Sequence, residues 1–233
     1  MRYSREKAKS SWLLTFGDLI TLLITLFILM VVLYRGEISD VQKWGEEQLD
    51  KTEIELKTAL VDSQFISVKR VLQGVQLNIS ANNSFVKGGF NPMPELKAEV
   101  EKLGEILKGL SFLSAKDGGM PNKIANAARK DNLILFREVS VSGHTDNDPI
   151  NPQSKLRNNW FLSAMRAQAV MDLLFQASNL PPSMFSISGL GEHHPIAPNT
   201  NLAGKVKNRR VQIIIIANFE KGSYTMNSTP NPQ

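Results

Sequence analysis

The sequence contains no cysteine, and histidine is rare, with three residues among 233. The absence of cysteine excludes a disulfide framework and thiolate chemistry. Two of the histidines, His193 and His194, are adjacent, but no carboxylate stands near them at the spacing of a metal-ligand motif. No nucleophile with a matching base is evident either. We therefore expect neither a metal centre nor an enzyme.

Charge is almost missing from residues 12–34, which read WLLTFGDLITLLITLFILMVVLY and contain Asp18 as the single charged residue. A helix of this length extends about 34 Å and can cross a hydrocarbon core of about 30 Å. A charge near the middle of a bilayer costs about 2.5–3.5 kcal/mol on insertion scales. Asp18 is therefore a candidate functional residue in a predicted transmembrane helix.

The charge that flanks this helix predicts its orientation. The chain carries 27 basic and 22 acidic residues, and four of the basic ones, Arg2, Arg5, Lys7 and Lys9, precede the apolar segment. Such a basic flank stays in the cytoplasm, so it indicates topology rather than nucleic-acid binding. A cleaved signal peptide would have a shorter apolar region of about 7–15 residues and a small-residue cleavage site. We expect a retained anchor, with residues 1–11 cytoplasmic and the rest exported.

Two polar segments, residues 35–63 and 221–233, lie on either side of residues 64–220. In residues 35–63, charged residues alternate with apolar residues at roughly helical spacing. This segment is either a solvated helical stalk or an amphipathic segment that lies on the membrane surface or against a partner. Residues 221–233 are polar and contain proline and serine, so we expect a disordered tail.

Residues 64–220 have the pattern of one α/β domain. The predicted order is strand, helix, strand, helix, strand, strand, which forms a sandwich of one mixed sheet with helices on one face. Because the last strand is rich in isoleucine, we expect it to be central and covered on both faces. Residues 111–137 remain open, as a loop followed by either a short helix or an insertion. The predicted strands are 74–80, 138–143, 184–189 and 209–219, and the predicted helices are 91–110 and 157–180.

Three motifs in this domain resemble the OmpA-like peptidoglycan-binding domain. They are Gly-His-Thr-Asp at 143–146, Leu-Ser-x-x-Arg-Ala-x-x-Val at 162–170 and Asn-Arg-Arg-Val at 208–211. Fifteen residues separate Asp146 from Leu162, and Trp160 stands just before the second motif. That spacing is similar to flagellar stator B subunits (MotB and PomB), although their usual Ser-Asn-Trp-Glu-Leu-Ser is here Asn-Asn-Trp-Phe-Leu-Ser.

The apolar helix carries a second resemblance to the same family. Trp12 followed by Phe16-Gly17-Asp18 matches the family's Trp and Tyr/Phe-Ala-Asp, with glycine in place of alanine. The resemblance implies that Asp18 is the site of a transported H⁺ or Na⁺ and that residues 37–50 are a channel plug. Thr21 and Thr25 could add oxygen ligands for sodium, or could simply bond the backbone of their own helix.

The resemblance also assigns a peptidoglycan site. Asp146 and Arg166 would bind the ammonium and carboxylate at one end of meso-diaminopimelate, because the arginine fork binds a carboxylate through two hydrogen bonds. Thr145 and Asn147 would add neutral hydrogen bonds. Of Arg209 and Arg210, one is expected to face the site and the other to serve the fold. The alternative is that Asp146 and Arg166 form a structural ion pair that binds nothing.

Together the two resemblances imply an ion-driven, peptidoglycan-anchored stator subunit of a rotary motor. The flagellar motor is the first candidate. The subunit would lie in the bacterial inner membrane as a homodimer with a multi-pass A subunit (MotA/PomA-like), without a nucleic-acid partner. One alternative is the motor subunit of an anti-phage defence system with the same architecture. Another is a passive tether between membrane and peptidoglycan, for which Asp18 would be dispensable.

Overall fold

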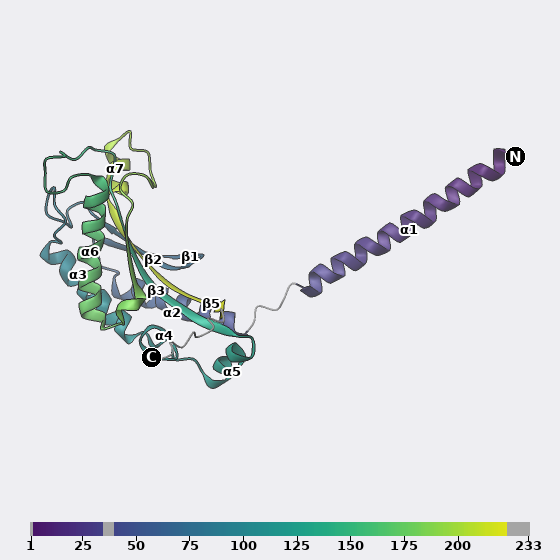
Figure 1. Cartoon of the computed structure of the whole chain (residues 1–233), viewed down its shortest axis with the longest axis horizontal. Coiled ribbons are helices and arrows are strands. Elements are labelled where there is room, and N and C mark those ends of the chain that lie inside the picture. The colour runs from purple at the N-terminus through teal and green to yellow at the C-terminus, as the bar shows by residue number, and fades with distance from the viewer. Residues whose placement is uncertain (1, 35–39, 223–233) are drawn as a thin grey trace, which may run out of the picture. The chain divides into compact units, whose positions relative to one another are not determined.

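The computed structural model describes residues 2–34 and 40–222, in two compact units, Met1–Ser39 and Asp40–Gln233. The first unit contains one helix, α1 (Arg2–Tyr34), drawn in purple in Figure 1. Within it, Trp12–Val32 is long and apolar enough to cross a membrane. The rings of Trp12 and Phe16, one helical turn apart, stack with centroids 5.3 Å apart on the N-terminal side of Asp18. The predicted apolar span is therefore a single uninterrupted helix.

The second unit contains a five-stranded sheet in the order β1-β2-β5-β3-β4. All neighbouring strands are antiparallel except β3 and β4, which are parallel. The long strand β5 lies between β2 and β3, so the isoleucine-rich segment is central as predicted. The strands are β1 (Ile66–Val71), β2 (Gly74–Ser80), β3 (Leu133–His144), β4 (Phe185–Gly189) and β5 (Arg210–Lys221).

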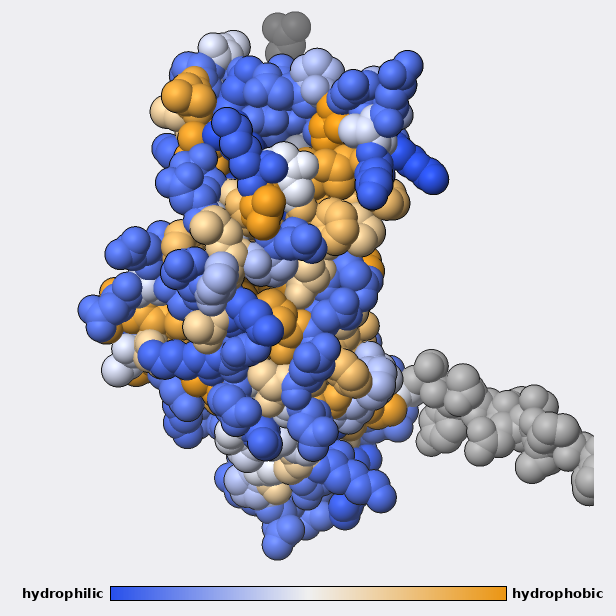
Figure 2. Space-filling view, turned by 90° about the vertical axis from the view of Figure 1, so that its left-hand side faces the viewer, coloured by the Kyte–Doolittle hydropathy of each residue, from blue (hydrophilic) through white to orange (hydrophobic). Residues whose placement is uncertain are grey.

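Helices pack on one face of this sheet and form the core with it. On β5, Val211, Ile213 and Ile215 are fully buried, and the side chains of β2 and β3 that pair with them are buried on the same face. Figure 1 shows α3 and α6 side by side along the sheet, and their outward side is mostly hydrophilic in Figure 2. The helices of this unit are α2 (Asp40–Ala59), α3 (Pro94–Gly109), α4 (Ser111–Ser114), α5 (Asn122–Lys130), α6 (Asn159–Ser178) and α7 (Leu202–Asn208), with the 3₁₀ turn η1 (Pro182–Met184).

The predicted class, a mixed sheet with helices on one face, is confirmed, but coverage of β5 on both faces is wrong. Ile214 and Ile216 point to the face opposite α3 and α6, and they are only half buried. The isoleucine run reflects the preference of β-branched residues for strands rather than burial of both faces.

The prediction lacked strand β1, the short helices α4 and α7 and the turn η1, and it began β3 too late. Strand β1 carries Lys69 and Arg70, charges that obscure the alternation and suit its position at the sheet edge. Strand β3 begins at Leu133, five residues before the predicted start, and α5 precedes it within the region left open. For the part that follows the predicted loop, the short helix is thus the correct alternative, at residues 122–130.

Helix α2 lies in the segment predicted as plug and linker. Its residues Val41, Leu49 and Leu56 are buried in the second unit. Arg70 of β1 pairs with Asp50 at 3.2 Å and also with Glu46, so charges hold the same helix. Residues 40–59 are therefore an amphipathic helix packed on the sheet. Positions 37–39 of the candidate plug, and 223–233 of the predicted tail, lie outside the described residues.

Candidate functional site

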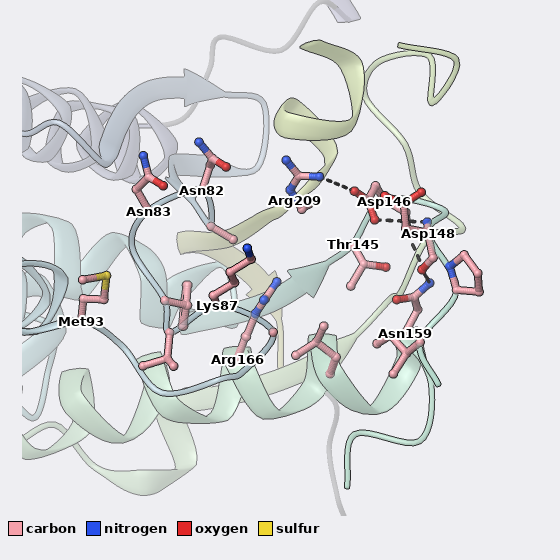
Figure 3. A pocket seen from close by; sticks show the side chains of 17 residues that line it. Asn82, Asn83, Lys87, Met93, Thr145, Asp146, Asp148, Asn159, Arg166 and Arg209 are labelled. Carbon is pink, nitrogen blue, oxygen red and sulfur yellow. Dashed lines mark hydrogen bonds and ion pairs between the residues drawn. The ribbon is translucent and has the colours of Figure 1, made fainter. Parts of the chain in front are cut away.

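A cavity of about 930 Å³ opens between the loop after β2, the loop after β3 and helix α6 (Figure 3). Four of its lining residues belong to the predicted peptidoglycan site: Thr145, Asp146, Arg166 and Arg209. The charged residues that line it are Lys87, Asp146, Asp148, Arg166 and Arg209.

The end of β3 positions Thr145 and Asp146 at the cavity. Gly143 lets β3 approach α6 so closely that a Cβ atom there would lie 1.9 Å from the carbonyl oxygen of Ser163. The backbone N–H of Thr145 donates to the carbonyl of Gly191 at 2.9 Å. Thr145 and Asp146 are both buried, and the Thr145 hydroxyl has no hydrogen-bond partner. The hydroxyl is therefore a buried polar group at the wall of the cavity with unused hydrogen-bonding capacity.

Helix α6 positions Arg166. The side chain of Asn158 accepts a hydrogen bond from the N–H of Phe161 and caps the helix. Arg166 is 7% exposed, and its Nε donates to the carbonyl of Gly89 at 3.0 Å. Its Cζ lies 5.3 Å from the ring centroid of Phe85, which is a cation–π contact.

The guanidinium of Arg166 forms no ion pair within the described part of the chain. No described carboxylate lies within ion-pair distance of its guanidinium. Burial, and secondly the positive charge of Arg209, lower the pKa of Arg166 to about 10, against an opposing effect of Asp146. Arg166 is therefore a buried cation that stays protonated at neutral pH. Such a group is stabilised by an anion that binds in the cavity.

Asp146 pairs with Arg209 rather than with Arg166. Arg209 Nη1 donates to Asp146 Oδ2 at 2.5 Å (Figure 3), and the N–H of Asp148 donates to Asp146 Oδ1 at 3.2 Å. A structural ion pair between Asp146 and Arg166 does not form. Because an ionised carboxylate has about four acceptor positions, Asp146 can still accept hydrogen bonds from a ligand.

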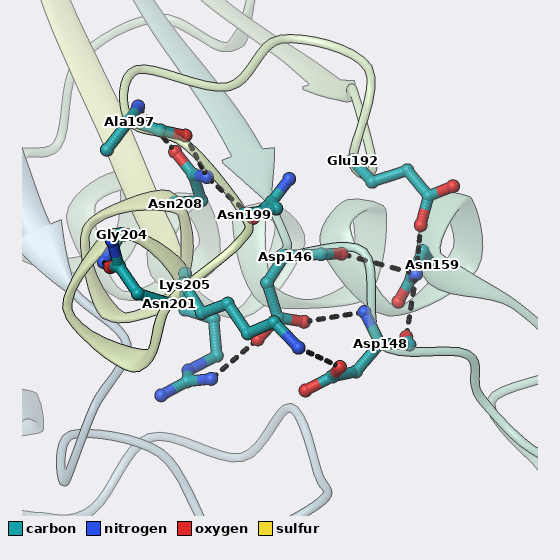
Figure 4. A network of polar contacts seen from close by, with 11 residues as sticks. Asp146, Asp148, Asn159, Glu192, Ala197, Asn199, Asn201, Gly204, Lys205 and Asn208 are labelled. Carbon is teal, nitrogen blue, oxygen red and sulfur yellow. Dashed lines mark hydrogen bonds and ion pairs between the residues drawn. The ribbon is translucent and has the colours of Figure 1, made fainter.

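A polar network stiffens the loop after β3 (Figure 4). Asn159 Nδ2 donates to Glu192 Oε2 at 2.8 Å and to the carbonyl of Asp148 at 3.0 Å. Lys205 Nζ pairs with Asp148 Oδ1 at 2.6 Å. Sequence reasoning did not assign Asp148, Asn159 or Lys205 to the site. The sequence signal for Asn159 is the Asn-Asn-Trp stretch, in which one asparagine caps the helix and the other holds the loop.

Two of the predicted site residues do not line this cavity. Asn147 is exposed and is not among the lining residues. Arg210 pairs in register with His144 on the opposite face of the sheet from α6. There its guanidinium donates to the carbonyls of Asn208 at 3.4 Å and His194 at 3.3 Å. Arg209 therefore lines the cavity, whereas Arg210 is buried behind it.

The buried side chain of His144 should make the unfolding free energy of the domain depend on pH. Burial, followed by the charges of Arg210 and His194, lowers the pKa of His144 from 6.5 to about 4. Since the unfolded chain binds the extra proton between pH 6.5 and 4, stability falls as pH falls through this window. We expect the unfolding free energy of the wild type to fall by about 2–3 kcal/mol more than that of His144→Gln between pH 7 and pH 4. Urea unfolding at both pH values measures this difference, and parallel losses in the two proteins would contradict it.

The predicted ion-site residues share one face of α1. Asp18, Thr21 and Thr25 follow each other at three- and four-residue spacing, which places them on the same side of a helix. The Thr21 hydroxyl donates to the carbonyl of Asp18 at 2.8 Å, and that of Thr25 donates to the carbonyl of Leu22 at 2.9 Å. Each hydroxyl proton is thus used by the backbone, while each oxygen retains lone pairs that can coordinate a cation.

Among residues 2–34 and 40–222, no group of three or more His, Asp or Glu side chains is placed to hold a metal ion. The ionisable side chains of the site are instead arranged for hydrogen bonding and ion pairing with a charged ligand.

Comparisons with known proteins follow the same division of the chain. Residues 2–43 match the family described as "Membrane MotB of proton-channel complex MotA/MotB", and residues 108–209 match the OmpA family. Motility protein B of Bacillus subtilis is 29% identical over 92% of this chain and 94% of its own length. Motility protein B of Helicobacter pylori strain J99 is 27% identical over 88% and 85%.

Solved structures agree with the fold. A MotB-like protein from Desulfovibrio vulgaris has a TM-score of 0.56 at 19% identity, over 80% of this chain and 99% of that one. A periplasmic domain of MotB has a TM-score of 0.50 at 23% identity, over 66% and 68%. The membrane helix, the OmpA-type domain and relatives that match along nearly the whole chain lead to one conclusion. This chain is similar to MotB proteins along nearly its whole length, with a MotB-type membrane segment and an OmpA-type domain.

Proposed function

We propose that this chain is the ion-conducting, peptidoglycan-anchored subunit of a flagellar stator. The observation that carries the proposal is Asp18, the one carboxylate in an otherwise uncharged helix of membrane length. A tether needs only an apolar helix, so a charge that is costly to insert favours an ion site. The similarity to motility protein B along nearly the whole chain supports the same function.

In the membrane helix, binding of a cation neutralises Asp18, and release of the cation restores its charge. In the proposed orientation residues 1–11 are cytoplasmic, and the OmpA-type domain lies outside the membrane. Asp18 takes up H⁺ or Na⁺, and the resulting change of charge alters its contacts with a multi-pass A subunit. One charge that moves through 100 mV releases about 2.3 kcal/mol, which can drive a mechanical step. We propose two copies of this chain in each stator.

The second unit supplies the fixed anchor that torque requires. The cavity offers the two groups that bind the ammonium and carboxylate of meso-diaminopimelate. Arg166 presents a guanidinium edge to the carboxylate, and Asp146 with Thr145 accepts hydrogen bonds from the ammonium. The segment 35–63 is proposed as the plug and linker, and it includes α2, which the structure packs on the sheet.

Arg166→Ala tests the anchor. We expect retention of the full-length protein on purified sacculi to fall about tenfold or more, because charge-assisted hydrogen bonds to the ligand carboxylate are lost. Arg166→Lys should recover only part of the binding, since lysine cannot form the planar fork. Co-sedimentation of detergent-solubilised protein with sacculi measures both variants.

The matched control is Arg129→Ala, which removes a basic residue from the exposed end of α5. It should bind sacculi like the wild type. If Arg166→Ala and Arg129→Ala bound equally well, the cavity would not be the peptidoglycan site.

A further inference from the structure

A tight turn brings an additional cation to the cavity. The N–H of Gly89 donates to the carbonyl of Val86 at 2.8 Å, and Gly88 has φ +67°. These features describe a β-turn with a left-handed residue at its third position, where glycine is favoured. Lys87 occupies the second position and is exposed. The turn therefore displays the lysine side chain at its tip.

The same turn is attached to Arg166. The carbonyl of Gly89 accepts the hydrogen bond from Arg166 Nε at 3.0 Å, and Lys87 is two residues earlier in the chain. Both side chains line the cavity (Figure 3). They differ in depth, because Arg166 is 7% exposed whereas Lys87 is exposed to solvent. One cation thus lies deep in the cavity and the other at its mouth.

The charges of the cavity do not balance within the protein. Asp146 pairs with Arg209, and Asp148 pairs with Lys205. Neither Lys87 nor Arg166 forms an ion pair with any carboxylate in the described part of the chain. Among the charged residues that line the cavity, Lys87 and Arg166 therefore have no carboxylate partner in the described part of the chain, whereas both aspartates have a cation. A ligand that complements this cavity carries two negative groups.

Resting on the proposed function, we infer that the cavity binds a peptidoglycan stem peptide through two carboxylates. Arg166 holds the carboxylate of the diaminopimelate end, and Lys87 pairs with the α-carboxylate of the neighbouring D-glutamate. Stem peptides in which this second carboxylate is amidated lose the contact with Lys87. Lys87 is thus a specificity-determining residue that distinguishes D-glutamate from D-isoglutamine stems.

Two synthetic tripeptides test this inference. Both contain L-Ala, a γ-linked second residue and meso-diaminopimelate amidated at its L-centre, and they differ only in D-glutamate against D-isoglutamine. Calorimetry with the full-length chain in detergent should give about fivefold tighter binding of the D-glutamate peptide, the upper range for an exposed ion pair. This ratio should fall towards one at high salt.

Substitution of the lysine should remove the preference alone. In Lys87→Met the two peptides should bind equally, with the D-isoglutamine peptide bound as in the wild type. Lys87→Arg should keep the preference, and so should Lys130→Met, which removes a lysine at the end of α5 outside the cavity.

These outcomes distinguish a failure of the Lys87 contact from a failure of the proposed anchor. If the wild type bound both peptides with equal affinity, or Lys87→Met kept the preference, the role of Lys87 would be refuted while the anchor stood. If the wild type bound neither peptide or sacculi, the proposed anchor would fail together with the inference.

Discussion

Cells that carry Asp18→Asn are expected to assemble flagella but not to swim. Asparagine has nearly the shape of aspartate, yet it cannot exchange a proton or offer a negative charge to sodium. The loss of swimming should be complete, because passage of the ion through Asp18 supplies the energy for torque. Tracking of single cells in a strain without a second stator set measures the effect, and Asp18→Glu, which retains a carboxylate, should keep partial motility.

The same cells can separate ion conduction from anchoring. Asp18→Asn protein should bind sacculi like the wild type, because the substitution lies outside the OmpA-type domain. Wild-type cells transferred from sodium to potassium buffer should stop if Na⁺ is the ion, and should continue if it is H⁺. Unimpaired swimming of Asp18→Asn cells would refute ion coupling through this residue and would favour the passive tether.

Gly143→Ala should destabilise the OmpA-type domain by at least about 3 kcal/mol. The added Cβ would lie 1.9 Å from the carbonyl oxygen of Ser163 and 2.6 Å from its carbonyl carbon. Both are backbone atoms of α6, so no side chain can rotate away and the helix must separate from β3. A loss of this size is a large part of the roughly 5–15 kcal/mol that stabilises an ordinary domain. Urea unfolding of the full-length chain, followed by tryptophan fluorescence, measures it.

Gly109→Ala is the matched control for this substitution. Gly109 ends α3, and no heavy atom lies within 4 Å of a Cβ placed there. Alanine should therefore be tolerated or should stabilise the helix by up to about 1 kcal/mol. Sacculus binding should fail for Gly143→Ala, because Asp146 follows β3 and Arg166 lies on α6. Equal urea midpoints for the two variants would show that β3 and α6 can separate without a loss of unfolding free energy.

The general fold and the membrane helix followed from local patterns. An apolar segment of membrane length, with one carboxylate and a basic flank, identifies a span and its candidate ion site without knowledge of the rest of the structure. Alternation in β2 and the apolar stripes of α3 and α6 reflect burial of one face of each element. By contrast, β1 could not be recognised, because Arg70 on its buried-facing side is compensated by acidic residues of α2.

The three sequence motifs already indicate which side chains the site can use, namely Thr145, Asp146, Arg166 and the two consecutive arginines. How these side chains are used follows from the three-dimensional arrangement of the strands and helices. Neighbouring residues of a strand point to opposite faces, so the register of β5 with β3 sends Arg210 behind the sheet. Arg209, just before the strand, reaches Asp146. Arg166 consequently remains without an anion, and the turn after β2 adds Lys87, because contacts between distant segments depend on packing rather than on local sequence.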